Sequence, residues 1–403
     1  MALGERPLRI GNPIRVNRDL KQHTLDFKII NHYLYRDYTE TEAAIEKVKA
    51  EQAELERPTG KVTRGLKVDQ LLDLYQNGGQ LRGVNKQLIK RFKPWLKAQL
   101  NIDLLYERLR EIKDEIQAKL LASHAIICST NSTAGCDLLL DEHFDWVVVD
   151  EAAQASIPSS LIAILKGERF VLVGDHFQLP PVVISQEAKE LKLDQSLMDY
   201  LARRYPYQLM RLNVQYRMHQ SINDLVGSLF YDGELLAHHS VSNRRLPFDE
   251  DIIELIQVVG QERILKDSRS YYNQTEIDVV ADVVAQLVER GLTAEQIAVI
   301  SPYKAQVSLL TKRLAQHCEI DTVDAFQGRE KDVVILTFVR SNSREQIGFL
   351  RDYRRLNVSI SRAKCKLILI GDFKTLRSDA LFEQLYETLE LIDGVKLPEF
   401  NRD

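Results

Sequence analysis

The chain has 403 residues, 44% of them apolar and 28% charged, which excludes a disordered chain, a collagen-like repeat and a coiled-coil rod. Its 54 Lys and Arg against 58 Asp and Glu give a net charge of −4, so any nucleic-acid surface has to be local. This length predicts two or three domains.

The four cysteines form neither a CxxC pair nor a Cys/His cluster, which argues against a disulfide framework and against a structural zinc site. We therefore expect a reducing compartment, the cytoplasm, or the nucleus in a eukaryote. No run of 18 apolar residues is present and the N-terminus lacks an apolar signal segment, so we expect no membrane association.

Residues 40–120 predict a helical insertion, because two charged amphipathic patterns flank a segment interrupted by Gly78, Gly79, Gly83 and Pro94. From Leu74 to Ile102 there is no acidic residue. This stretch holds six basic residues and two aromatic ones, namely Arg82, Lys86, Lys90, Arg91, Lys93 and Lys97 with Phe92 and Trp95. One interpretation is a solvated helix face, and the other is a phosphate-contacting patch with a stacking aromatic ring.

Short apolar runs rich in β-branched residues predict strands of parallel sheets that are buried on both faces. They lie at Ala125–Cys128, Trp146–Val149, Phe170–Val173, Ile253–Val259, Ile297–Ile300, Val333–Val339 and Leu367–Ile370. Helical spacing appears between them, at Glu276–Arg290 and Val307–Gln316. Strands that alternate with helices indicate an α/β fold.

Two neighbouring strands end in polar residues suited to phosphate chemistry. The first is followed by Asp150 and Glu151 in DEAAQ, and the second by GDHFQLPP, which contains Gln178. Ligands of α/β sheets bind at the carboxyl ends of strands. One carboxylate there can hold Mg²⁺ and the next can activate a water, while a fixed glutamine can sense the γ-phosphate. The alternative for each motif is an ordinary surface loop.

Three further segments carry candidate phosphate contacts. Arg217 lies in QYRMH (215–219), and its planar guanidinium suits an oxyanion, although a surface salt bridge is the alternative. Gly328 and Glu330 lie in VDAFQGREKDVVIL (323–336), and the glycine allows a tight backbone turn. Arg362 precedes a strand in RRLNVSISRAK (354–364), as an arginine finger does.

Taken together, DEAAQ, GDHFQLPP, QYRMH, SPYKAQ (301–306), VDAFQGREKDVVIL and RRLNVSISRAK resemble the motifs of superfamily 1B helicases, in the same order. The branch with the nonsense-mediated-decay helicase, senataxin and the immunoglobulin-mu-binding helicase is the most similar. RIGNPIRVN (9–17) and ICSTNSTAG (127–135) also resemble segments of that branch. The resemblance covers nearly the whole chain, with 40–120 similar only in helical character.

The resemblance implies a role for each matching residue. Asp150 is expected to bind Mg²⁺, Glu151 to activate water and Gln178 to sense the γ-phosphate of ATP. Arg217 and Arg362 are expected to contact that phosphate from a second RecA-like domain. Gly328, Glu330 and Tyr216 are expected to line the nucleotide site. The residues expected to face single-stranded DNA or RNA are Thr130, Ser301, Pro302, Tyr303 and Thr322. The family translocates 5′ to 3′.

The chain departs from the family, because the phosphate-binding P-loop, GxxxxGK[ST], and the glutamine motif and small β-barrel that the family places before it are not found in this sequence. The only Gly-Lys pair, Gly60-Lys61, has Leu55 and Val62 where the motif needs glycine and a hydroxyl. Without a P-loop strand, the first sheet is expected to have unpaired edges. Three explanations fit: a split helicase whose partner chain supplies the P-loop, a fragment of a longer gene, or a degenerate non-enzyme.

We therefore expect two RecA-like parallel-sheet domains, the first of them incomplete. The first comprises 1–39 and 121–211, the helical insertion 40–120, and the second domain 212–403. The expected function is an ATP-dependent 5′→3′ helicase or translocase, with the isolated chain inactive. The alternative is a single-stranded nucleic-acid-binding module, inactive or part of a split enzyme.

Overall fold

The computed structural model describes residues 6–63, 65–77, 86–248, 251–266, 268–393 and 395–397. Within it the chain forms two compact units, Met1–His143 and Phe144–Asp403. This division differs from the predicted domain boundaries, because β3 (Phe144–Val149) and β4 (Gly167–Leu172) group with the C-terminal sheet. The predicted boundaries remain predictions.

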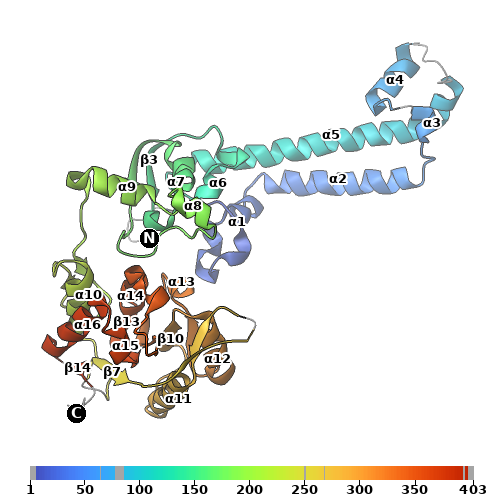
Figure 1. The fold of residues 1–403 in the computed structure, drawn as a ribbon. Coiled ribbons are helices and arrows are strands. Elements are labelled where there is room, and N and C mark those ends of the chain that lie inside the picture. Colours follow the sequence, from blue (N-terminus) through green and yellow to red (C-terminus); the bar gives the residue numbers. More distant parts are fainter. Residues whose placement is uncertain are drawn as a thin grey trace. The chain divides into compact units, whose positions relative to one another are not determined.

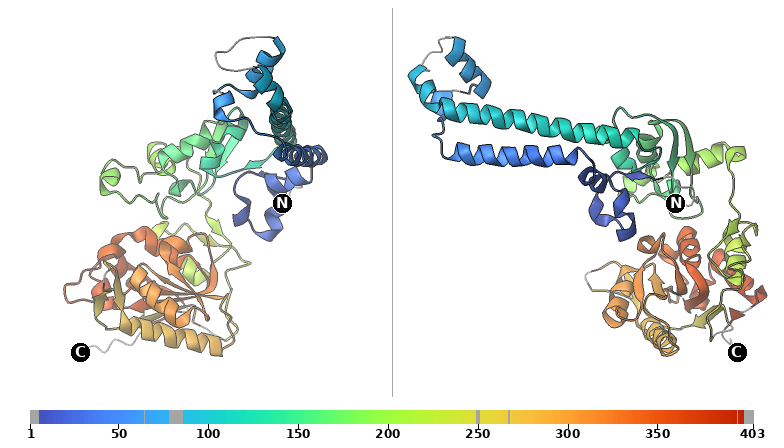
Figure 2. Two further views of the ribbon diagram at one scale, coloured as in Figure 1. Left: turned by 90° about the vertical axis from the view of Figure 1, so that its right-hand side faces the viewer. Right: turned by 180° about the vertical axis from the view of Figure 1, so that it is seen from behind.

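The first unit is dominated by two long helices, α2 (Tyr35–Ala53) and α5 (Lys86–Ala122), which lie side by side and antiparallel (Figures 1 and 2). Their charged residues pair mostly within each helix, as in Arg36–Glu40 and Lys119–Glu115. At the far end are two short helices, α3 (Gly60–Thr63) and α4 (Val68–Asn77). The predicted helical character of 40–120 is thus confirmed for the residues of this range that the structure describes.

Pro94 does not interrupt the helix, contrary to the prediction, since α5 runs through it. Proline removes one backbone hydrogen bond, but Phe92 and Leu96 on either side are buried in an apolar cluster with Leu71 and Leu72 of α4. That packing holds the helix together at this point. Gly78, Gly79 and Gly83 lie outside the described residues.

The two ends of the first unit come together in a short parallel pair, in which β1 (Leu8–Arg9) bonds β2 (Ile127–Cys128). Helix α1 (Leu25–Ile30) follows β1 and helix α6 (Asn131–Ala134) follows β2. The predicted strand at 125–128 is therefore present but shorter. It brings RIGNPIRVN beside ICSTNSTAG although more than a hundred residues separate them in the sequence.

The second unit is built on a six-stranded sheet in the order β11-β10-β12-β13-β7-β14, with every pair parallel. The strands are β7 (Ile253–Gln257), β10 (Ile297–Ser301), β11 (Glu319–Thr322), β12 (Lys331–Thr337), β13 (Ala363–Gly371) and β14 (Val395–Lys396). This is the parallel α/β arrangement that the alternating pattern predicts, and the fold class is confirmed.

Helices cover both faces of this sheet (Figure 1). On one face Ile300, Leu336 and Leu369 pack against α10 (Gln220–Phe230), α14 (Tyr353–Ile360) and α16 (Ala380–Leu391). On the other, Val299, Ile335 and Ile368 pack against α11 (Gln274–Glu289) and α12 (Lys304–Leu314). Alternate residues of each strand therefore pack into different hydrophobic cores. Because both faces of the strand are buried, its sequence is a continuous run of apolar residues.

Strands β3 and β4 form a separate parallel pair, against which α7 (Ile157–Ile164) packs. Their predicted burial on both faces is wrong in this structure, where Trp146 is 54% exposed and Val148 63%. Two strands and one short helix cannot cover both faces.

The remaining α-helices and strands of the described residues are α8 (Gln186–Glu190), α9 (Leu197–Arg204), β5 (Val214–Gln215), β6 (Leu236–Ala237), β8 (Glu262–Ile264), β9 (Tyr271–Asn273), α13 (Val323–Phe326) and α15 (Phe373–Leu376).

One carboxyl group, that of Glu276 in α11, is fully buried in the second unit. Its Oε2 accepts hydrogen bonds from the hydroxyl of Thr337 and from Val339 N at 2.9 Å, and Oε1 accepts one from Asn273 at 3.3 Å. No cation pairs with it among the described residues. Burial raises the pKa of Glu276 to about 8, against the opposing effect of these hydrogen bonds.

This carboxyl group makes stability depend on pH. The folded pKa of about 8 lies above the value of 4.5 for an exposed group, so the folded chain keeps a proton that the unfolded chain has released. The stabilisation is full below pH 4.5 and is lost as the pH rises through about 8. We expect Glu276→Gln to make the midpoint temperature of thermal unfolding depend less on pH. Circular dichroism at a series of pH values measures this midpoint. Glu289→Gln, on the exposed end of α11, is the control, and a parent-like slope in Glu276→Gln would contradict the assignment.

Candidate active site

The two predicted carboxylates follow directly on β3. Asp150 Oδ1 accepts a hydrogen bond from Glu151 N at 3.0 Å, and Glu151 Oε2 accepts one from Gln154 Nε2 at 2.7 Å. Glu151 has φ 52° and ψ 36°, a left-handed conformation that costs energy for any residue with a Cβ. Both side chains are exposed. The left-handed conformation of Glu151 turns the chain sharply just after β3.

The GDHFQLPP segment lies beside these carboxylates, as the adjacent strand ends predict. Val173 N bonds Val149 O and Ala152 N bonds Val173 O, both at 2.8 Å, so the β3–β4 ladder continues into the loops. A Cβ on Gly174 would lie 3.1 Å from the backbone nitrogens of Ala152 and Ala153. Glycine is therefore required by close approach of the two loops.

Asp175 organises the loop that carries Gln178. Its carboxylate accepts hydrogen bonds from Phe177 N at 2.9 Å and from Gln178 Nε2 at 3.0 Å. The hydroxyl of Tyr231, at the end of α10, donates to the same carboxylate. Burial and the charge of Asp175 raise the pKa of Tyr231 far above its ordinary value, so it remains a donor.

Asn357 of α14 completes this arrangement. Its Nδ2 donates to Phe177 O at 3.0 Å and to the Tyr231 hydroxyl at 2.9 Å. The Phe177 and Tyr231 rings meet edge to face at 5.5 Å between centroids. Asp175, Tyr231 and Asn357 thus fasten the Gln178 loop to the helix that leads to Arg362. Sequence analysis assigned none of the three a role, although Asp175 and Asn357 lie inside quoted motifs.

Arg362 is only 3% exposed and lies against Gln178. Its Nε donates to Val358 O at 3.0 Å, and its Nη2 donates to Gln178 Oε1 at 3.2 Å. No acidic side chain forms an ion pair with it in the described part of the chain. Burial, with the like charge of Arg217, lowers the pKa of Arg362 to about 10. A buried guanidinium group that lacks an ion-pair partner favours the binding of an anion next to it.

Arg217 lies next to Arg362 and is held by Glu330. Its Nε donates to Glu330 Oε2 at 2.6 Å, and its Nη1 donates to Ser361 O at 3.1 Å. Lys364 pairs with the other Glu330 oxygen at 3.0 Å. Burial opposes ionisation of Glu330, but the hydrogen bonds from Arg217 and Lys364 prevail and lower its pKa. The structure thus brings Gln178, Arg217, Glu330 and Arg362 together.

The other predicted nucleotide-site residues are more peripheral. Tyr216 is 61% exposed and its ring lies 4.4 Å from that of His238. Gly328 has φ 80°, so glycine serves the backbone turn before Glu330, and a Cβ there would meet nothing within 4 Å. Asp150 adjoins Glu151, whose charge acts on Arg362.

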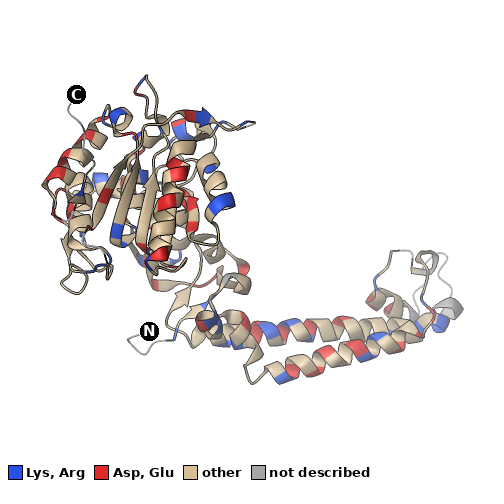
Figure 3. Ribbon diagram, turned by 90° about the horizontal axis from the view of Figure 1, so that it is seen from below, with Lys and Arg blue, Asp and Glu red and all other residues tan. Residues whose placement is uncertain are grey.

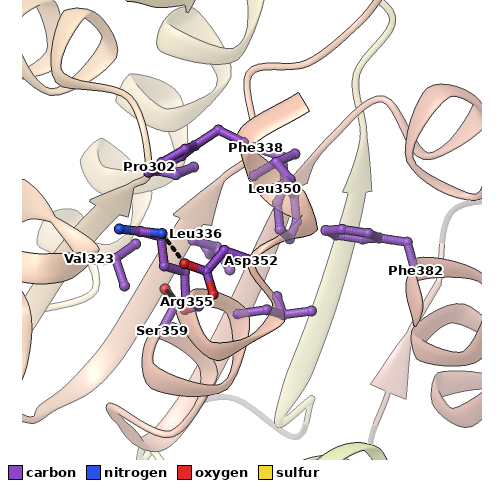
Figure 4. A pocket seen from close by; sticks show the side chains of 11 residues that line it. Pro302, Val323, Leu336, Phe338, Leu350, Asp352, Arg355, Ser359 and Phe382 are labelled. Atoms are coloured by element: carbon purple, nitrogen blue, oxygen red, sulfur yellow. Dashed lines mark hydrogen bonds and ion pairs between the residues drawn. The ribbon is translucent and has the colours of Figure 1, made fainter. Parts of the chain in front are cut away.

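The predicted nucleic-acid residues of the second unit lie at the carboxyl ends of neighbouring strands, where Ser301 is in register with Thr322. Ser301 and Tyr303 are buried, and the Tyr303 ring packs edge to face on Tyr271. Pro302 is half-buried and lines a mostly apolar pocket with Val323, Leu336 and Phe338 (Figure 4). Contacts from this loop to a ligand would therefore come from its backbone, Pro302 and Thr322.

The remaining predicted nucleic-acid residues belong to the first unit. Thr130 is exposed and its hydroxyl caps α6 by accepting from Thr133 N at 3.2 Å. Lys90 and Arg91 are exposed, and Arg91 pairs with Glu56 at 2.6 Å. Lys93 is half-buried.

Trp95 is half-buried against the Phe92 cluster, and Arg57 lies 5.9 Å from its ring. Phe92 is buried, so it is no free stacking platform. Basic and acidic residues are interspersed along the two long helices (Figure 3). Of the basic residues in this stretch, Arg91 is partly neutralised by its pairing with Glu56.

Two family models, each described as an AAA domain, match residues 3–186 and 193–374. The chain is 36% identical over 404 residues to an uncharacterized ATP-dependent helicase of Methanocaldococcus jannaschii, covering 96% of this chain and 60% of that protein. It is 35% identical to DNA-binding protein SMUBP-2 of Mesocricetus auratus (95% and 37% covered) and 36% identical to the ATP-dependent helicase NAM7 of Saccharomyces cerevisiae (69% and 30% covered). The chain belongs to the superfamily 1B helicases. It spans between 30% and 60% of the length of these three relatives.

Family membership confirms the resemblance drawn from the six ordered motifs. The assignments of individual residues remain predictions, supported by the geometry above. None of the helices in the described ranges is both long and apolar enough to cross a membrane.

The Tyr231 hydroxyl offers a test of how the Gln178 loop is fastened. Tyr231→Phe removes one donor to Asp175 and one acceptor for Asn357, and we expect it to cost about 1–3 kcal/mol of unfolding free energy. Hydrogen exchange of residues 174–179, followed by mass spectrometry, should quicken. Tyr200→Phe, whose ring is 48% exposed on α9, is the matched control. Equal exchange in both variants would show that the loop is held by other contacts.

Proposed function

We propose that this chain is the motor portion of an ATP-dependent helicase or translocase that moves 5′→3′ on single-stranded DNA or RNA. The observation that carries the proposal is the meeting of Gln178, Arg217 and buried Arg362, with no acidic partner for Arg362 among the described residues. Two guanidinium groups beside a glutamine form a receptor for a phosphoryl group in transfer, because they stabilise the negative charge of its transition state.

In this proposal each side chain acts on ATP in a distinct way. Arg362 and Arg217 stabilise the transferring γ-phosphoryl group, and Gln178 senses its presence through its bond to Arg362. Glu151 activates the attacking water, while Glu330, Gly328 and Tyr216 border the nucleotide. Glu330 keeps Arg217 in place until the phosphate competes for it.

Magnesium is the metal that the family implies, and Asp150 fits it. One of its oxygens accepts from Glu151 N, and Oδ2 has no hydrogen-bond partner among the described residues. An exposed carboxylate oxygen is the ligand that hydrated Mg²⁺ prefers. When bound, the ion neutralises charge on the β- and γ-phosphates.

The phosphate cradle itself is proposed to come from polypeptide outside these residues, since the sequence contains no GxxxxGK[ST]. We propose a separate or preceding chain segment with that motif as partner. The second candidate function, a single-stranded nucleic-acid-binding module without ATP turnover, is favoured by that same absence. The isolated chain is proposed to be inactive in ATP hydrolysis.

ATP hydrolysis separates the two candidates. With the P-loop segment supplied, we expect Arg362→Ala to lower kcat by about 10³-fold or more with little change in nucleic-acid affinity. Arg217→Ala should act in the same direction. Arg354→Ala, in the same motif, is the control and should remain within a few-fold of the parent. Turnover by the chain alone at helicase rates, lost in Glu151→Gln, would refute the need for a partner, and an unaffected Arg362→Ala would refute the arginine finger.

The basic tip of the insertion can be tested by salt dependence. Each phosphate contact contributes about 0.7 to the slope of log K against log salt on single strands. We expect the combined change of Lys90, Arg91 and Lys93 to alanine to flatten that slope by up to about two units. Fluorescence anisotropy on one labelled oligonucleotide measures it. Changing Arg108, Arg110 and Lys113 on the shaft of α5 is the control, and equal slopes for tip variant and parent would support a merely solvated face.

A further inference from the structure

The chain leaves β12 through a strained residue. Val339 has φ 73°, a left-handed conformation that a β-branched residue rarely adopts. Two buried side chains hold it there: Glu276 accepts from Val339 N at 2.9 Å, and Asn273 donates to Val339 O at 3.4 Å. The surrounding structure therefore imposes this backbone conformation and fixes the direction in which the following residues leave the sheet.

The next two residues are fixed as firmly. Arg340 is buried and donates through Nε at 2.8 Å and Nη2 at 3.0 Å to Glu262, with its guanidinium over the ring of Tyr271. Ser341 donates from its hydroxyl to Asp372 at 2.7 Å. Gly348 closes against the same arginine, since a Cβ there would overlap Arg340 Nη1.

Asn342 then closes a short turn. Its Nδ2 donates to Gln346 O at 2.9 Å and to Glu262 Oε2 at 3.1 Å, and its Oδ1 accepts from Gln346 N at 3.0 Å. Ser378 donates to Glu345 O at 2.9 Å from outside the turn. We call residues 339–346 the braced arm, because every backbone change of direction in it is fixed by a hydrogen bond.

The tip of the braced arm is Arg344. It is exposed, and its guanidinium has no hydrogen bond or ion pair in the part of the chain that the structure describes. The arm follows the carboxyl end of β12, beside β10 and its Ser301–Tyr303 loop. The rings of Tyr303 and Phe349 are 6.2 Å apart, and Pro302 shares a pocket with Phe338 and Leu350 (Figure 4). Arg344 thus belongs to a segment that begins at the carboxyl end of β12 and returns at Phe349 to the edge proposed to face nucleic acid.

We propose that the braced arm presents Arg344 to a backbone phosphate of single-stranded nucleic acid, with Asn342 as its positioning residue. This inference rests on the proposed function and adds a contact to it. A guanidinium fork suits a phosphate. Because the backbone of the tip is already held by hydrogen bonds, binding costs little backbone conformational entropy, so one contact contributes more of its interaction energy to affinity.

The test uses the full chain and a labelled oligothymidylate, followed by fluorescence anisotropy over a salt series. We expect Arg344→Ala to weaken binding several-fold at low salt and to reduce the salt slope by about 0.7. Arg344→Lys should retain the slope. Arg290→Ala is the control, because this exposed arginine lines a pocket with Gln296 and Asp332 at the amino ends of β10 and β12. Equal effects of Arg344→Ala and Arg290→Ala would overturn the proposal.

A double-mutant cycle tests the positioning role. In an Asn342→Ala background, Arg344→Ala should cost clearly less than in the parent, because the unbraced tip no longer meets the phosphate. If the effects of Asn342→Ala and Arg344→Ala on binding are additive, Asn342 does not position Arg344, and Arg344 acts only as a surface charge. A parent chain that binds no oligothymidylate at any salt concentration would instead refute the proposed nucleic-acid function, and the arm with it.

Discussion

The buried charge of Arg362 is the constraint around which the second unit is arranged. A guanidinium that is 3% exposed needs hydrogen-bond acceptors, and the described residues supply only neutral ones: Val358 O, Gln178 Oε1 and a Ser361 hydroxyl. Burial lowers its pKa because the charged form lacks a compensating anion. The surrounding protein has to be rigid enough to keep that cation in place, and the contacts of Asp175, Tyr231 and Asn357 supply this rigidity.

Arg217 shows the opposite solution to the same electrostatic problem. It is more exposed than Arg362 and has a carboxylate partner in Glu330, which Lys364 shares. Because Arg217 and Arg362 repel one another, Glu330 reduces the cost of keeping two cations together when no phosphate is present. In the proposed function, an incoming phosphate replaces Glu330 at Arg217 and meets Arg362, which has no ion-pair partner among the described residues. The two arginines therefore differ in how readily they respond to a ligand.

Sequence analysis identified the main sheet from local patterns, and the residues that it named at strand ends, Gln178, Arg217 and Arg362, lie together in the structure, while their roles remain predictions. Continuous apolar runs such as 333–339 mark strands that enter two cores, and polar residues at their ends mark the site. It missed Tyr231 because its partner Asp175 is 56 residues away and only tertiary packing joins them. It misjudged Pro94 because the apolar cluster around Phe92 outweighs one lost hydrogen bond. Similarly, the inward direction of the Ser301 and Tyr303 side chains depends on neighbours that no local pattern reveals.

Strand β12 connects the two ends at which chemistry is proposed. Glu330 immediately precedes it and holds Arg217, whereas the strained Val339 follows it and begins the braced arm. A strand of this length spans roughly 20 Å and, buried between two helical layers, it does not bend independently. One rigid strand therefore joins two anchored ends, since Glu330 pairs with Arg217 before β12 and the hydrogen bonds of Asn273 and Glu276 hold Val339 after it.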